Sequence, residues 1–181
     1  MPSAAFGWPS LKAAMAVTFS TVHHTVFIVS DFERSVAFYS KLFGKEPTMR
    51  AEVQDYPQFD AFVQAQHAHA LVAFFELANA AFEIIQFINP QESVEQVSVH
   101  RPGSKHFCLA VDDADAIYQA LKAEGYNFIS APCHFSPAQG ALDGIVAAYF
   151  LDPDGNVIEI VEDPKKKSLL GKIGLSNPED N

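Results

Sequence analysis

The sequence repeats one arrangement of polar side chains and structural elements in its two halves. His24 stands seven residues before Asp31 in the first half, and His106 stands seven residues before Asp113 in the second. Each histidine lies near the start of an apolar run typical of a strand, and each aspartate precedes a helical pattern. Such a repeat constrains the fold strongly, because both copies must form the same supersecondary unit.

The first half predicts a strand, a helix and three further strands. We expect strands at 22–29, 47–53, 71–77 and 81–88, with a helix that Gly44 ends. Ser30 and Glu33 have the spacing of a capping box at the start of that helix. In segment 54–70 we expect a short amphipathic helix or flap.

The second half predicts the same order of elements. We expect strands at 105–111, 126–130, 144–151 and 157–161, with a helix at 112–124 and a long loop at 131–143. The sequence therefore predicts an α+β fold of two paired βαβββ modules, whose strands form a curled mixed sheet around a cleft. The expected parts are an N-terminal extension 1–20, a first module 21–90, a linker 91–104, a second module 105–163 and a C-terminal tail 164–181.

One carboxylate stands at the centre of the last expected strand. Glu159 is flanked by β-branched residues on both sides, where an unpaired charge is costly. Aligning residues 80–86 with 156–162 places Glu83 opposite Glu159. Each half thus offers one histidine on its first strand and one glutamate on its last.

If the first and last strands of both modules surround one cleft, two imidazoles and two carboxylates converge there. This set suits one divalent metal ion with positions left for water or substrate, and Ni, Co, Mn, Zn and Fe are all compatible. The predicted ligands are His24, Glu83, His106 and Glu159. The alternative is that each is a satisfied core polar group, but the pairwise match favours the metal site. His23 is a rival to His24, yet strand alternation turns it to the opposite face.

Composition narrows the function classes. The 22 acidic residues against 12 basic residues argue against nucleic-acid binding. No apolar run is long enough to span a membrane, and the first residues do not have the pattern of a secretion signal. The two cysteines make no disulfide framework, so we expect a cytoplasmic protein.

Several motifs together resemble the vicinal oxygen chelate superfamily, which includes glyoxalase I, bleomycin-resistance proteins and extradiol dioxygenases. The resemblance covers residues 20–163 and rests on His24, segment 31–39 (DFERSVAFY), segment 82–84 (FEI), His106 with segment 111–113 (VDD), and segment 152–159 (DPDGNVIE). It implies a metal held between the two modules, a small-molecule substrate and a homodimer. An acid at the Glu83 position is similar to the pattern of glyoxalase I proteins.

The resemblance implies a metal-dependent lyase or isomerase acting on vicinal oxygens through an enediolate-like intermediate, with Glu83 or Glu159 as the base. Glyoxalase I proteins of bacteria typically hold glutathione with Arg and Asn at the positions that are Ile28 and Phe87 here, so glutathione dependence is not expected. We expect Ile28, Phe87, Cys108 and Tyr149 to line the substrate pocket. The alternatives are an Fe(II) ring-cleaving dioxygenase and a metal-free drug-binding protein.

Overall fold

The computed structural model describes residues 21–94 and 98–165, and there the α+β architecture is confirmed. The expected extension 1–20 and residues 166–181 of the expected tail lie outside the described residues. The elements of the first module are β1 (His24–Ile28), α1 (Phe32–Phe43), β2 (Met49–Val53), α2 (Pro57–Val63), β3 (His69–Glu76) and β4 (Ala81–Asn89).

The second module follows the same order, with two short additions. Its elements are β5 (His106–Ala110), α3 (Ala114–Ala123), β6 (Asn127–Phe128), β7 (Cys133–His134), the 3-10 helix η1 (Pro137–Leu142), β8 (Val146–Leu151) and β9 (Val157–Glu162). The segment expected as a loop at 131–143 thus contains β7, which pairs with β8. A two-residue strand is too short to produce an alternation pattern in the sequence.

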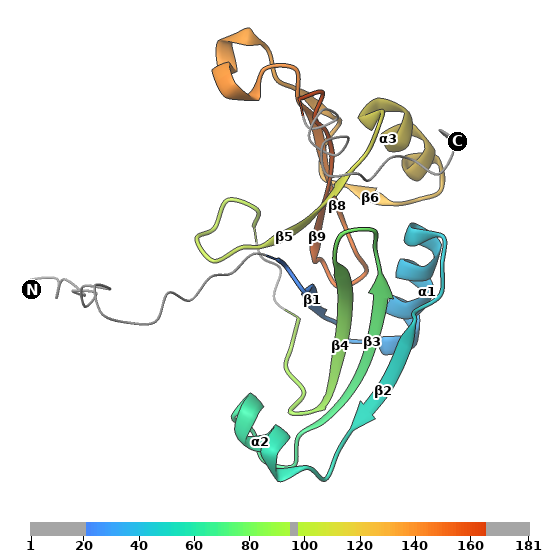
Figure 1. Cartoon of the computed structure of the whole chain (residues 1–181), viewed down its shortest axis with the longest axis vertical. Coiled ribbons are helices and arrows are strands. Elements are labelled where there is room, and N and C mark those ends of the chain that lie inside the picture. The colour runs from blue at the N-terminus through green and yellow to red at the C-terminus, as the bar shows by residue number, and fades with distance from the viewer. Residues whose placement is uncertain (1–20, 95–97, 166–181) are drawn as a thin grey trace, which may run out of the picture.

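The two modules form two mixed sheets of equivalent topology. The strand order is β1-β4-β3-β2 in one and β5-β9-β8-β6 in the other. In both, the first strand is parallel to the last, with His24 opposite Ala81 and His106 opposite Val157. Each histidine therefore pairs with the residue two positions before its module's glutamate. Figure 1 shows the modules one above the other, with α1 and α3 on the same side.

The helix starts also repeat, with one difference from expectation. Asp31 caps α1 by accepting a hydrogen bond from the Arg34 amide, and Asp113 caps α3 in the same way through Ala116. The expected capping box with Ser30 is wrong, because the Ser30 hydroxyl donates to Asp154 of the other module instead. Gly44 ends α1 with a φ of 65°, a conformation that glycine adopts without strain.

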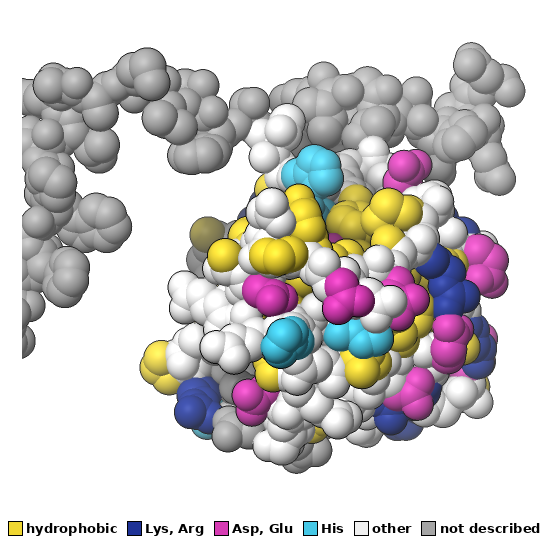
Figure 2. Space-filling view, turned by 90° about the horizontal axis from the view of Figure 1, so that it is seen from below, with side chains coloured by type: hydrophobic (Ala, Val, Ile, Leu, Met, Phe, Trp, Pro, Cys, Tyr) yellow, Lys and Arg dark blue, Asp and Glu magenta, His cyan; other side chains and the backbone are white. Residues whose placement is uncertain are grey.

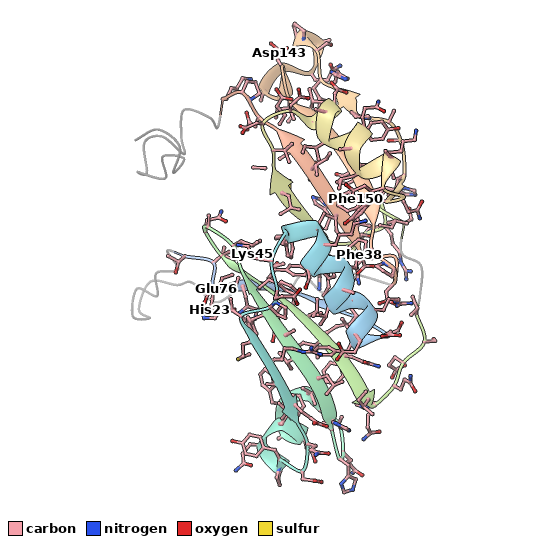
Figure 3. All side chains as sticks on the ribbon, turned by 90° about the vertical axis from the view of Figure 1, so that its right-hand side faces the viewer. His23, Phe38, Lys45, Glu76, Asp143 and Phe150 are labelled. Carbon is pink, nitrogen blue, oxygen red and sulfur yellow. The ribbon has the colours of Figure 1, made fainter. Side chains whose placement is uncertain are left out.

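The hydrophobic core lies between the helices and the sheets and is continuous across both modules. Ile158 and Ile160 of β9 are buried in it, as strand alternation around Glu159 predicts. Phe82 of β4 packs against Phe107 of β5, with ring centroids 4.8 Å apart. Figure 3 shows both helices on one side of the sheets, with Phe38 and Phe150 near the junction of the modules.

The 152–156 turn that precedes β9 docks on the first module. Asp152 accepts a buried hydrogen bond from the Tyr39 hydroxyl at 2.8 Å. Asp154 accepts hydrogen bonds from Ser30 and from Arg34, the latter at 2.6 Å. The Asn156 amide donates to the carbonyl of Ile28 at 3.2 Å. These contacts fix the end of β1 relative to the second module.

The surface carries charges of both signs. On the face seen in Figure 2, Lys and Arg side chains stand beside Asp and Glu rather than forming one basic patch. Arg50 pairs with Glu33, and Lys41 pairs with Glu124. Across 21–94 and 98–165, no helix is long and apolar enough to cross a membrane.

Candidate functional site

The first His–Glu pair lies on the neighbouring parallel strands β1 and β4. His24 Nε2 is 3.2 Å from Glu83 Oε2, and the Glu83 side chain is largely buried. Val26 and Phe74 lie opposite Glu83 in the two flanking strands. The Phe74 ring meets the His24 ring edge-on, at a centroid distance of 5.5 Å. Apolar neighbours thus flank the buried carboxylate, while the His24 side chain stays 37% exposed.

The second pair occupies the equivalent place on β5 and β9. His106 Nε2 is 3.1 Å from Glu159 Oε2. Cys108 and Tyr149 take the positions that Val26 and Phe74 hold in the first module. The Tyr149 ring lies 5.3 Å from the His106 ring. The repeat therefore extends to side-chain geometry, while the flanking residues are more polar in the second module.

Burial raises the pKa of one acidic group at each His–Glu pair. Burial raises the pKa of Glu83, and the charges of His24 and His23 act in the opposite direction. Burial also raises the pKa of Tyr149, and the charges of Glu159 and Cys108 raise it further. A carboxyl group with a raised pKa is a better proton acceptor than an ordinary exposed one.

The two pairs are not brought together in one chain. Within residues 21–94 and 98–165, no group of three or more His, Cys, Asp or Glu side chains is placed to hold a metal ion. Each pair alone supplies two ligand types that divalent transition metals accept, one imidazole and one carboxylate. The donor chemistry thus fits such a metal, and a site with all four ligands stays a prediction.

His23 contacts the first pair, which differs from the sequence interpretation. Its Nδ1 lies 2.7 Å from His24 Nδ1, although alternation would turn the two rings to opposite faces. The reason is that β1 begins at His24, so His23 precedes the strand and does not follow its alternation. The adjacent histidines were visible in the sequence, but the strand boundary was not.

A cavity of about 440 Å³ opens at the far end of β1 and β4 from the first pair. Ile28 and Phe87, two of the predicted pocket residues, both line it. They lie four residues beyond His24 and Glu83 on the same sheet face, since side chains alternate along a strand. The other two predicted residues, Cys108 and Tyr149, lie beside Glu159 instead.

The cavity has an apolar side and a polar side. The apolar lining residues come from β1 and the residue after it, from α2, from β4 and from the segment after β4: Ile28, Val29, Val63, Phe87, Pro90 and Val94. The polar lining residues come from the segment just after β1, the segment after β4 and the 152–156 turn: Ser30, Gln91, Glu92, Ser93, Asp154 and Asn156. No pattern in the sequence indicates the contribution of the turn, because that contribution depends on how the modules dock.

Comparisons with known proteins agree with this architecture. The sequence profile of the Glyoxalase/Bleomycin resistance protein/Dioxygenase superfamily matches residues 21–160. A lactoylglutathione lyase from Haemophilus influenzae is 30% identical over 148 residues, which cover 82% of this chain and 96% of that protein. The structure of a glyoxalase family protein from Bacillus cereus superposes with a TM-score of 0.67 at 16% identity, covering 82% of this chain and 98% of that one.

A further solved structure gives the same result. A glyoxalase/bleomycin resistance protein from Albidiferax ferrireducens has a TM-score of 0.51 at 25% identity, covering 78% of this chain and 98% of that one. The fold is thus that of glyoxalase-type proteins. The chain belongs to the Glyoxalase/Bleomycin resistance protein/Dioxygenase superfamily.

Proposed function

We propose that the protein is a metal-dependent lyase or isomerase that acts on a small substrate with two adjacent oxygen atoms. The observation that carries this proposal is the pair of equivalent contacts, His24 with Glu83 and His106 with Glu159. Packing alone does not require this repeated imidazole and carboxylate, because two apolar side chains at the same positions would cost less free energy to bury.

The chain's own residues have two tasks in this proposal. The two histidines hold the metal and orient the substrate oxygens. Glu83 or Glu159 removes the proton from the carbon beside the carbonyl and delivers it to the neighbouring carbon. The bound divalent ion supplies stabilisation of the negative charge that develops on the substrate oxygens.

We further propose that the complete site forms between two copies of the chain. Each His–Glu pair offers two ligands, whereas a catalytic metal site in a protein commonly uses three or four protein ligands. Val26 and Ile28, on the same face as the first pair, are 42% and 51% exposed. A homodimer in which the first pair of one copy meets the second pair of the other completes the ligand set and covers this face.

We propose that glutathione is not the substrate carrier. The H. influenzae relative is named a lactoylglutathione lyase, but Ile28 and Phe87 offer this chain no charged or amide group with which to hold a peptide.

The chain has only two cysteines, which supports our expectation of a reducing, cytoplasmic location.

Elemental analysis of the purified protein tests the proposal. We expect about one divalent metal in the wild type for each complete site, which joins one His24–Glu83 pair with one His106–Glu159 pair. Most of this metal should be lost in Glu83→Ala and in Glu159→Ala. Glu52→Ala is the matched control, because Glu52 contacts His69 at 2.7 Å elsewhere on the first sheet. A wild type that takes up no metal contradicts the proposal, and iron retained in Glu83→Ala favours the dioxygenase alternative.

A further inference from the structure

The residues that line the 440 Å³ cavity beside β1 indicate which kind of molecule it can bind. Its volume lies in the range of pockets that hold small organic molecules. It is lined by Ile28 of β1, Val63 of α2 and Phe87 of β4, which come from three elements of the first module. Phe59 stacks on Phe87 at a centroid distance of 6.4 Å.

The polar side of the cavity carries carboxylates without a lining cation. Asp154 and Glu92 line it, and no Lys, Arg or His is among the described residues that do. Arg34 contacts Asp154 at 2.6 Å, but its guanidinium also donates to Ser30 and does not line the cavity. A ligand carboxylate here would face the carboxylates of Asp154 and Glu92, and Gln91 and Ser93 offer it uncharged donors but no positive charge.

The amide of Asn156 is also engaged. Its Nδ2 donates to the carbonyl of Ile28 at 3.2 Å and to Asp152 at 2.9 Å, which uses both of its protons. It therefore has no side-chain proton left for a ligand carboxylate. The net charge of −10 disfavours anions further.

From this chemistry we propose that the cavity binds an uncharged apolar arm of the substrate and discriminates against an anionic arm. The arm reaches it along the sheet, because Ile28 lies four residues beyond His24, or roughly 13 Å at 3.3 Å per residue. The substrate class is thus an alkyl or aryl compound whose adjacent oxygens lie about that far from the end of the apolar arm. The assignment of the occupant as part of the substrate rests on the proposed function.

Three probes with one carbon skeleton test the charge preference: 4-phenylbutanol, 4-phenylbutyrate and 4-phenylbutylamine. Binding to the full-length protein is followed by NMR, through the amide signals of Ile28, Val63 and Phe87. We expect the alcohol to shift these signals and the carboxylate to bind at least about tenfold more weakly, a difference of about 1.4 kcal/mol. Equal or tighter binding of the carboxylate, or no shift with any probe, overturns the proposal.

Variants that introduce a positive charge test whether the cavity sets the preference for the uncharged probe. Ile28→Arg and Val63→Arg place a cation on two different walls, and each should reverse the preference in favour of 4-phenylbutyrate. Ile88→Arg is the control, because Ile88 is 42% exposed and does not line the cavity. Reversal by Ile88→Arg as well, or by neither wall variant, shows that the cavity does not set the preference.

The outcomes separate this inference from the proposed function. A protein that takes up metal but shows no preference among the probes keeps the function and loses the cavity assignment. A protein that takes up no metal but prefers the neutral probe at these residues keeps the cavity chemistry and loses the lyase or isomerase proposal.

Discussion

The Tyr39 hydroxyl donates a hydrogen bond to the Asp152 carboxylate at 2.8 Å, and both residues are buried. Tyr39 belongs to the helix of the first module and Asp152 to the turn before the last strand of the second. Burial raises the pKa of Tyr39, and the neighbouring charge of Asp152 raises it further, so the phenol stays a donor. This hydrogen bond therefore joins the two modules and involves none of the candidate metal ligands.

We expect Tyr39→Phe to destabilise the protein by about 1 to 3 kcal/mol, because it removes a donor from a buried carboxylate. Urea unfolding measures the change. Tyr56→Phe is the control, since Tyr56 is 53% exposed and should change stability little. Equal stabilities of wild type and Tyr39→Phe would show that the bond does not join the modules energetically.

Asp154 predicts a specific pH dependence of stability. Burial alone would raise its pKa, but hydrogen bonds from Ser30 and the charge of Arg34 outweigh burial and lower it. A carboxylate with a lowered pKa in the folded state stabilises the protein above its unfolded pKa, and this contribution is lost as the pH falls through the folded pKa.

We therefore expect Asp154→Asn to cost about 1 to 2 kcal/mol near neutral pH. The difference from wild type should shrink as the pH falls below about 4. Unfolding curves recorded between acidic and neutral pH measure it, with Asp55→Asn on an exposed turn as the control. A difference that grows on acidification would contradict the assignment.

Mixing two inactive variants tests the site between copies. His24→Ala and His106→Ala each lose one ligand of every site. When the two are refolded together, half of the dimers carry both variants and have one intact site each, so about a quarter of the wild-type metal content returns. If instead both pairs of one chain meet, the mixture retains no more metal than the separate variants.

Phe82 of β4 lies in the hydrophobic core, so we expect its truncation to destabilise the protein strongly. Phe82 is fully buried and contacts Tyr39, with ring centroids 4.6 Å apart, and Phe107 of the second module. We expect Phe82→Ala to cost about 3 to 5 kcal/mol of unfolding free energy. Phe62→Ala, at a side chain that is 82% exposed, provides the matched control. Similar thermal midpoints for both variants would refute this role of Phe82.

The sequence by itself determined the order of elements in each half and the strands on which the candidate ligands lie. Strand alternation and the repeat can be followed along the chain, so they placed one histidine on the first strand and one glutamate on the last strand of each module. The contacts of His24 with Glu83 and of His106 with Glu159 come from the pairing of those strands. The same alternation failed at His23, because a strand boundary depends on the hydrogen-bonded partner rather than on composition.

Only the tertiary structure decided what lies between the modules. It showed that Ser30 binds Asp154 instead of capping a helix, that the two His–Glu pairs stay apart in one chain, and that the 152–156 turn closes a cavity over Ile28. The contact of Ser30 with Asp154 and the cavity over Ile28 join residues more than a hundred positions apart. They follow from how two buried faces pack together, and no periodicity along the chain records that.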